Sequence, residues 1–108
     1  MKLNDYQQSA LSTAIYSEDY MILYPALGLC GEAGEVADKI KKVLRDNDGY
    51  FDEEKSKEIM FELGDVLWYL SSLADDLGFT LEEVAQANII KLADRAKRNK
   101  LQGSGDMR

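Results

Sequence analysis

Two pairs of acidic residues lie inside apolar stretches of this chain, where charged side chains are unfavourable. Glu32 and Glu35 lie in the run LGLCGEAGEVADKIKKV, and Glu62 and Asp65 lie in IMFELGDVLWYLSSL. The residues of each pair are three apart, a spacing that places both side chains on one face of a helix. Carboxylates among apolar side chains need a cationic partner, a metal or a raised pKa. The pattern therefore predicts that the two pairs are the halves of one metal site.

The types of donor atom indicate which metal such a site would bind. The four carboxylates offer only oxygen, and the chain has no histidine and one cysteine, Cys30. Oxygen ligands suit hard cations, so we expect Mg²⁺ or Mn²⁺ rather than zinc or a di-iron centre. Protein-bound Mg²⁺ usually also contacts substrate phosphates. The chain has no P-loop and no dinucleotide-binding glycine motif, so basic side chains are the candidates for phosphate contacts. These candidates are Lys39, Lys42, Lys91 and Arg95.

A simpler explanation of the first acidic pair stays open. Glu35 lies four residues before Lys39, and such a spacing commonly forms a solvated ion pair on a helix. The glycines of the same run favour the metal site. Gly28, Gly31 and Gly34 would each destabilise a helix interior by roughly 0.5–1 kcal/mol relative to alanine. Their presence indicates that another backbone or a ligand approaches closely there.

Four helices are expected to position these residues. Polar N-caps, a capping-box pattern at Thr80 and Glu83, and the turn signal Asp46-Asn47-Asp48-Gly49 mark their ends. No segment alternates in the manner of a strand. We therefore expect an all-α fold, an antiparallel four-helix bundle, in a single domain spanning 1–108. Residues 99–108 are expected to be a flexible basic tail. The predicted helices cover about residues 4–18, 25–45, 52–77 and 81–98.

The composition narrows the class of protein. The net charge of −7 disfavours general nucleic-acid binding. No apolar run approaches the ~20 residues that a membrane span requires. A single cysteine is consistent with a reducing cytoplasm, so we expect a cytoplasmic protein. From the net charge and the lack of a long apolar run, we expect neither a nucleic-acid nor a membrane partner. The charge is uneven, because residues 91–108 carry six basic and two acidic side chains. An acidic body with a basic end could bind both a cation and an anion.

The acidic motifs and their surroundings resemble a known enzyme family. GEAGEV followed by ELGDVLWYL resembles the E-x-x-E … E-x-x-D signature of MazG-type nucleoside triphosphate pyrophosphohydrolases, an all-α family. The runs ALGLCGEAGEVADKIKK, LEEVAQANIIKLADR and GSGDMR are similar to that family as well. The resemblance covers the chain from about Leu27, and YQQSALSTA resembles the first helix of small single-domain members.

The resemblance implies hydrolysis of a nucleoside or deoxynucleoside triphosphate to the monophosphate and pyrophosphate. It also implies a homodimer or homotetramer whose site is lined partly by a neighbouring subunit. By matching positions, it implies the metal ligands Glu32, Glu35, Glu62 and Asp65. We interpret Glu35, the less enclosed of the first pair, as the general base. The residues expected to contact the triphosphate are Lys39, Tyr69, Asn88, Lys91 and Arg95.

Two alternative functions stay open at this point. One is a non-catalytic helical module that binds nucleotides or a partner helix. The other is a pyrophosphohydrolase that acts on a different pyrophosphate, such as phosphoribosyl-ATP. Self-association is predicted independently of any family, because the third helix is apolar nearly all round and a chain this small cannot cover it.

Overall fold

The computed structural model describes all 108 residues and contains four α-helices, one short 3₁₀-helix and no strand. The elements are α1 (Leu3–Leu11), η1 (Glu18–Tyr20), α2 (Leu23–Asp46), α3 (Glu53–Asp76) and α4 (Leu81–Lys97). The prediction of an all-α chain is confirmed. Helices α3 and α4 lie within one residue of their predicted bounds, because the sequence supplies their caps. The Asp52 side chain accepts a hydrogen bond from the Lys55 amide, and Thr80 with Glu83 forms a capping box.

Helix α1 is shorter than predicted, since it ends after nine residues instead of continuing to about residue 18. The hydroxyls of Ser12 and Thr13 donate to carbonyls of the last helical turn, at 2.6 and 2.8 Å. The Trp68 indole donates to the Ala10 carbonyl at 3.1 Å and to the Thr13 hydroxyl at 2.8 Å. These bonds satisfy groups at the helix end that a further turn would otherwise satisfy. A contact from a distant helix therefore fixes where α1 stops.

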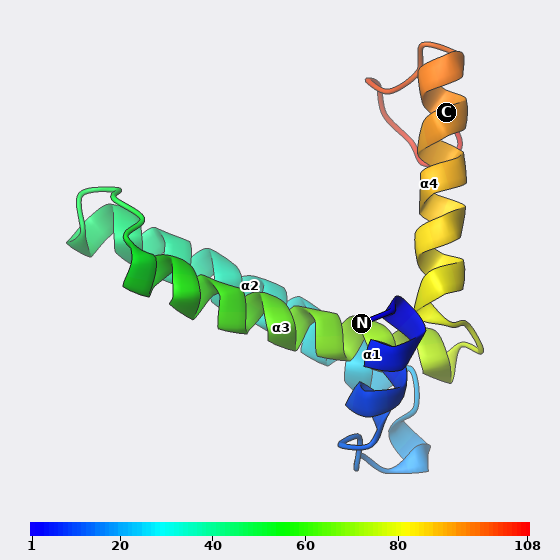
Figure 1. The fold of residues 1–108 in the computed structure, drawn as a ribbon, viewed down its shortest axis with the longest axis horizontal. Coiled ribbons are helices and arrows are strands. Elements are labelled where there is room, and N and C mark those ends of the chain that lie inside the picture. The colour runs from blue at the N-terminus through cyan, green and yellow to red at the C-terminus, as the bar shows by residue number, and fades with distance from the viewer.

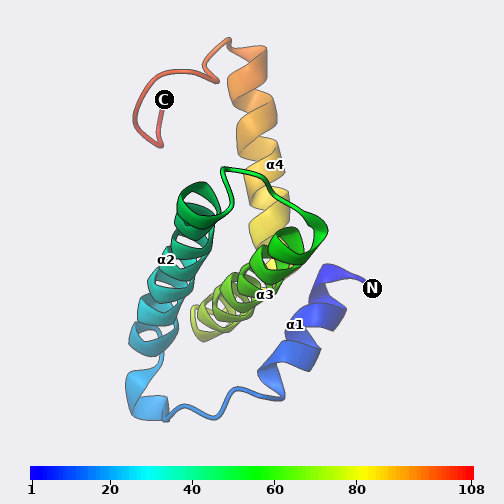
Figure 2. The same ribbon diagram turned by 90° about the vertical axis from the view of Figure 1, so that its left-hand side faces the viewer.

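Helices α2 and α3 lie side by side along most of their length (Figures 1 and 2). Gly28 permits their close approach, because a Cβ atom at this position would lie 2.5 Å from Tyr69 Cζ and closer still to two other ring carbons. A close approach thus occurs at Gly28, but a side chain makes it and not the backbone or ligand that we expected. Gly31 and Gly34 have no such neighbour, and a Cβ atom at either would meet nothing within 4 Å. The α2–α3 pair is the platform for the acidic residues.

Gln7 joins the remaining helices to this platform. Its side chain is buried, and its Nε2 donates to the carbonyls of Ser71 at 3.2 Å and Phe79 at 3.1 Å. Its Oε1 accepts from the Leu81 amide at 2.9 Å. One amide thereby bonds α3, the α3–α4 turn and the first residue of α4. A buried amide of this kind fixes the relative positions of the helices that it joins, because leaving any of its hydrogen-bonding atoms without a partner would destabilise the fold.

The chain is open. Helix α4 packs against α1 and the end of α3 and then extends away from the α2–α3 pair (Figure 1). Only 9 of the 108 residues are buried, and the radius of gyration is 16.7 Å, whereas a compact domain of this length would have about 13 Å. The four helices therefore do not close into a bundle within one chain. A bundle of four antiparallel helices would thus need helices from more than one chain, and both this bundle and the homo-oligomer stay predictions. None of the helices combines the length and apolar character of a membrane span.

Candidate metal centre

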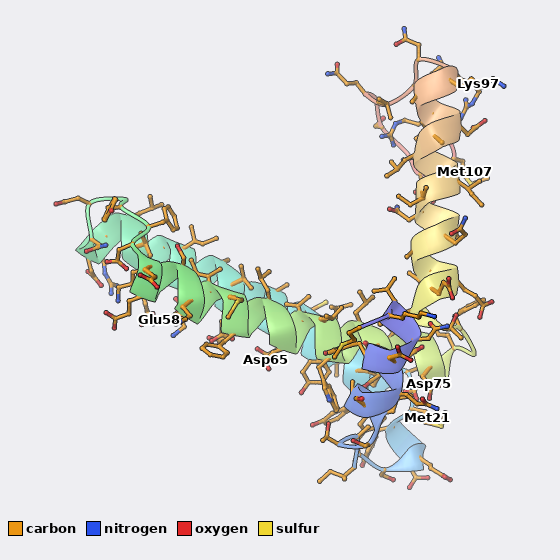
Figure 3. The ribbon with its side chains drawn as sticks, viewed as in Figure 1. Met21, Glu58, Asp65, Asp75, Lys97 and Met107 are labelled. Atoms are coloured by element: carbon orange, nitrogen blue, oxygen red, sulfur yellow. The ribbon has the colours of Figure 1, made fainter.

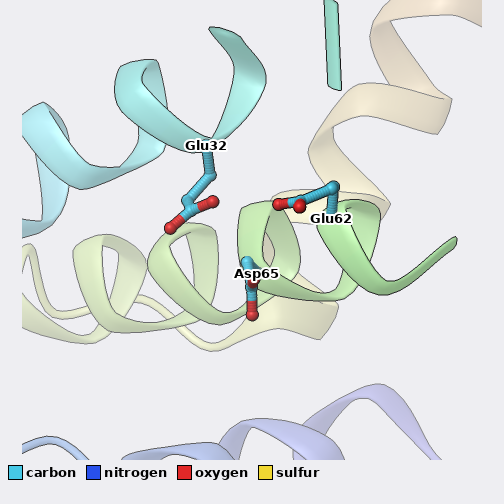
Figure 4. A group of neighbouring side chains, drawn as sticks. All are labelled: Glu32, Glu62 and Asp65. Atoms are coloured by element: carbon cyan, nitrogen blue, oxygen red, sulfur yellow. The ribbon is translucent and has the colours of Figure 1, made fainter. Parts of the chain in front are cut away.

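Three carboxylates from two helices converge on the α2–α3 pair. Glu32 of α2 and Glu62 and Asp65 of α3 each present a carboxylate oxygen, and the three oxygens lie within 4.8 Å of one another (Figure 4). Glu32 and Glu62 are half-buried, and Asp65 is exposed. We refer to these three residues as the acidic cluster. The i, i+3 spacing brings Glu62 and Asp65 to one side of α3, and the packing of α2 against α3 brings Glu32 opposite them.

The acidic cluster has no cationic partner within the chain. None of the ion pairs of the structure involves any of the four predicted metal ligands. Burial raises the pKa of Glu32, and the negative charges of Asp65, Glu62 and Glu35 raise it further. Like charges this close disfavour the ionised state unless a cation offsets them. The arrangement is therefore suited to binding a cation.

Glu35 lies outside the acidic cluster, one turn further along α2, and is exposed. The solvated Glu35–Lys39 ion pair, the simpler explanation of the first acidic pair, does not form. Instead Asp38 takes the nearby cations, with Lys41 at 2.9 Å and Lys42 at 2.8 Å. The structure thus brings together three of the four predicted ligands, and the fourth is near enough for its charge to raise the pKa of Glu32.

A cavity of about 340 Å³ opens beside the acidic cluster. Tyr69 lines it, and burial raises the pKa of its hydroxyl. Trp68 stands edge-on to Tyr69, with ring centroids 4.9 Å apart. Thr13 also lines the cavity, and no sequence pattern indicated this, because only the contact of α1 with α3 brings it there. The complete lining is Thr13, Glu32, Asp65, Trp68 and Tyr69.

The other predicted substrate contacts lie elsewhere in the chain. Asn88 and Lys91 line a separate depression of about 520 Å³ on α4, and Arg95 is buried further along the same helix. Lys39 lines a third cavity, of about 300 Å³, together with residues next to the α2–α3 turn. Figure 3 shows Asp65 on the α2–α3 pair and Lys97 near the far end of the divergent α4. One chain therefore does not bring the predicted cations of α4 to the acidic cluster.

Comparison with known proteins identifies the family of this chain. The model of the MazG nucleotide pyrophosphohydrolase domain matches residues 24–99, which include all of α3 and α4 and the acidic cluster. The chain is also similar to the Gene 37 protein of Mycobacterium phage L5, with 44% identity over 114 aligned residues that cover 100% of both chains. No solved structure matches. On this family match, the chain belongs to the MazG nucleotide pyrophosphohydrolase family.

Proposed function

We propose that this protein hydrolyses nucleoside or deoxynucleoside triphosphates to the monophosphate and pyrophosphate, in a metal-dependent reaction. The observation that carries the proposal is the acidic cluster, whose three carboxylate oxygens lie within 4.8 Å of one another and two of whose members, Glu32 and Asp65, line a cavity of about 340 Å³. Family membership supports the reaction type, since the matching family consists of nucleotide pyrophosphohydrolases. The choice of a triphosphate as substrate is our inference.

The donor set fits a hard divalent cation. Glu32, Glu62 and Asp65 supply only oxygen, and neither a histidine nor a cysteine is part of the cluster. These are the donors that Mg²⁺ and Mn²⁺ prefer. When bound, the ion would polarise phosphoryl oxygens and offset their negative charge. Until then, the uncompensated carboxylates repel a polyphosphate, so we expect activity to depend strictly on the metal.

The side chains around the cluster have separate roles in the proposed reaction. Glu35 is exposed and outside the cluster, so its carboxylate is free to accept the proton of the attacking water. The Tyr69 hydroxyl lines the adjoining cavity and can donate a hydrogen bond to a phosphate oxygen there. Phosphoryl transfer needs little else from the protein besides positioning and charge stabilisation. Lys91 and Asn88 would stabilise the charge that develops on the leaving pyrophosphate.

A second copy of the chain would complete the site. Lys91 and Asn88 lie on α4, which extends away from the α2–α3 pair of its own chain (Figure 1). Large apolar side chains are exposed on both parts, for example Phe61 at 66% on α3 and Ile89 at 62% on α4. Burying such side chains is favourable. We propose a homodimer or homotetramer in which α4 of one chain supplies its cation to the acidic cluster of another.

A single substitution tests the role of the acidic cluster. Glu62→Gln keeps the size of the side chain but removes its charge, and we expect the rate of pyrophosphate release from a panel of dNTPs with Mg²⁺ to fall at least roughly a hundred-fold. The scale follows from metal sites, where even residues behind the ligands change affinity or activity about 10–100-fold. Glu54→Gln is the matched control, since it makes the same change at an exposed position two turns earlier on α3.

The products decide between the possible reactions. The proposal requires pyrophosphate and a nucleoside monophosphate from the wild-type protein, and near-normal activity from Glu54→Gln. Wild-type turnover by Glu62→Gln would refute the ligand role. Release of orthophosphate from the wild-type protein would place the cleavage at a different phosphorus atom and refute the proposed reaction.

A further inference from the structure

The last residues of the chain fold back along α4 (Figure 1). Residues 99–108, predicted as a flexible basic tail, contain no regular helix, and we call residues 101–108 the C-terminal strap. Gly103 and Gly105 adopt φ angles of +123° and +86°, which permit the reversal of direction. The Arg108 guanidinium closes the strap by donating to the carbonyls of Lys100, Leu101 and Gly105, at 3.2, 3.0 and 2.7 Å.

The strap places a carboxylate on two of the cations that were assigned to phosphate. Asp106 Oδ1 accepts from Lys91 Nζ at 2.8 Å and from Arg95 Nη2 at 3.1 Å. Arg95 Nη2 also donates to the backbone carbonyl of Asp106. The hydrogen bonds from Lys91 and Arg95 hold the pKa of Asp106 below its usual range, so this carboxylate is charged at neutral pH. A carboxylate therefore takes the place that a phosphate oxygen would occupy on Lys91.

The two cations differ in accessibility. The Arg95 side chain is only 7% exposed, and its guanidinium contacts both the backbone and the side chain of Asp106. Arg95 is thus enclosed by the strap and unavailable to a ligand from solvent. Lys91 is 41% exposed, and its one ion-pair partner, Asp106, is 73% exposed. An ion pair as exposed as this is screened by water and weakly held.

We propose that Asp106 is an internal anion that occupies Lys91 until a substrate phosphate replaces it, and that Arg95 is the positioning residue that holds Asp106 in place. This inference rests on the proposed function, in which Lys91 contacts the leaving pyrophosphate. A polyphosphate has several negative charges against the single charge of Asp106, so it displaces the carboxylate from the exposed cation. Arg95 retains its bond to the backbone carbonyl of Asp106 when this happens.

The effect of Asp106 on the apparent affinity for a polyphosphate can be calculated. A ligand that needs Lys91 binds only the fraction of molecules in which Asp106 has left it, and its apparent dissociation constant rises by the inverse of that fraction. For exposed ion pairs of ordinary strength, this factor is roughly two to six. Removing the charge of Asp106 should therefore tighten polyphosphate binding by about that factor.

The test measures binding of inorganic tripolyphosphate by calorimetry in the presence of Mg²⁺. We compare the wild-type protein with Asp106→Asn, Lys91→Met and the double variant. Asp106→Asn retains the backbone carbonyl that Arg95 contacts, and we expect it to bind roughly two to six times more tightly than the wild type. Lys91→Met should bind more weakly, and adding Asp106→Asn to it should give no gain, because the competing pair no longer exists.

A second measurement does not depend on any Asp106 variant. Tripolyphosphate added to the wild-type protein should shift the amide resonances of Gly103 and Gly105, and these shifts should be absent in Lys91→Met. Equal or weaker binding by Asp106→Asn, or a strap whose resonances do not respond, would overturn the inference. Neither readout uses turnover. Failure of the proposed function would instead appear as no pyrophosphate release by the wild-type protein.

Discussion

Replacing Gly28 by alanine tests the close contact between Gly28 of α2 and the Tyr69 ring of α3, the two helices that carry the acidic cluster. The added Cβ atom would lie 2.5 Å from Tyr69 Cζ, well inside van der Waals contact, and closer to two other carbons of the ring. The ring has little room to turn away. Trp68 stands edge-on to it at 4.9 Å, and the Tyr24 ring lies 6.2 Å away on the other helix. Either Tyr69 must leave its position beside the cluster or α2 must move away from α3.

Gly31→Ala is the matched control, because it adds the same methyl group on the same helix where nothing lies within 4 Å. Both substitutions gain about 0.5–1 kcal/mol of helix propensity. Only Gly28→Ala incurs overpacking, which typically destabilises by about 1–3 kcal/mol. For a chain of 108 residues, 1 kcal/mol shifts Tm by about 4 °C. Gly31→Ala should therefore unfold about 2–4 °C above the wild type, and Gly28→Ala about 4–12 °C below Gly31→Ala.

Thermal unfolding of the metal-free proteins, followed by circular dichroism, measures these shifts. Trp68 fluorescence gives a local signal, since the indole touches the ring that must move. Pyrophosphate release should also fall in Gly28→Ala, because Tyr69 lines the cavity beside the cluster. Equal Tm values for Gly28→Ala and Gly31→Ala would show that the ring yields freely. The reasoning that Gly28 fixes the geometry of the cluster would then be refuted.

Two further predictions address the shared site and the connection between helices. Refolding a mixture of the Glu62→Gln and Lys91→Ala proteins should restore about a quarter of the wild-type activity in a homodimer. Half of the dimers are then mixed, and each mixed dimer has one intact site. Activity no higher than that of either variant alone would contradict a site shared between chains. The Tyr16 hydroxyl donates to Asp76 at 2.8 Å, and burial with this bond raises its pKa to about 12. The stability that this neutral hydroxyl contributes should be complete below pH 10 and lost as the pH rises through about 12. The difference between the absorbance titrations of the wild type and Tyr16→Phe at 295 nm reports the ionisation of Tyr16. A midpoint near pH 10 in this difference would contradict the prediction.

The local features of the fold could be predicted from the sequence. Asp52, Thr80 and Glu83 act on backbone amides within three residues of themselves, so α3 and α4 begin where their caps stand. The i, i+3 spacing of Glu62 and Asp65 likewise needs no partner helix to place both carboxylates on one face. Interactions between residues three or four positions apart depend only on neighbouring residues, so they can be predicted from the sequence alone.

The end of α1 and the lining of the cavity could not be predicted in this way. Trp68 donates to Ala10 and Thr13, more than fifty residues away, and only tertiary packing brings these groups together. Gly28 illustrates the same limit. The sequence indicated a close approach near the acidic run, but the partner, the ring of Tyr69, emerged only from the way that α2 packs against α3.

The sequence by itself determined an all-helical chain, its acidic motifs and an oxygen-only donor set, because caps, helical periodicity and residue chemistry are local properties. Tertiary structure decided which acids converge, placing Glu32 with Glu62 and Asp65 and leaving Glu35 outside the cluster. It also decided that Lys91 faces Asp106 and that α4 extends away from the α2–α3 pair of its own chain. These are consequences of how helices pack and where loops reverse, and packing sums many weak contacts between residues far apart in the chain.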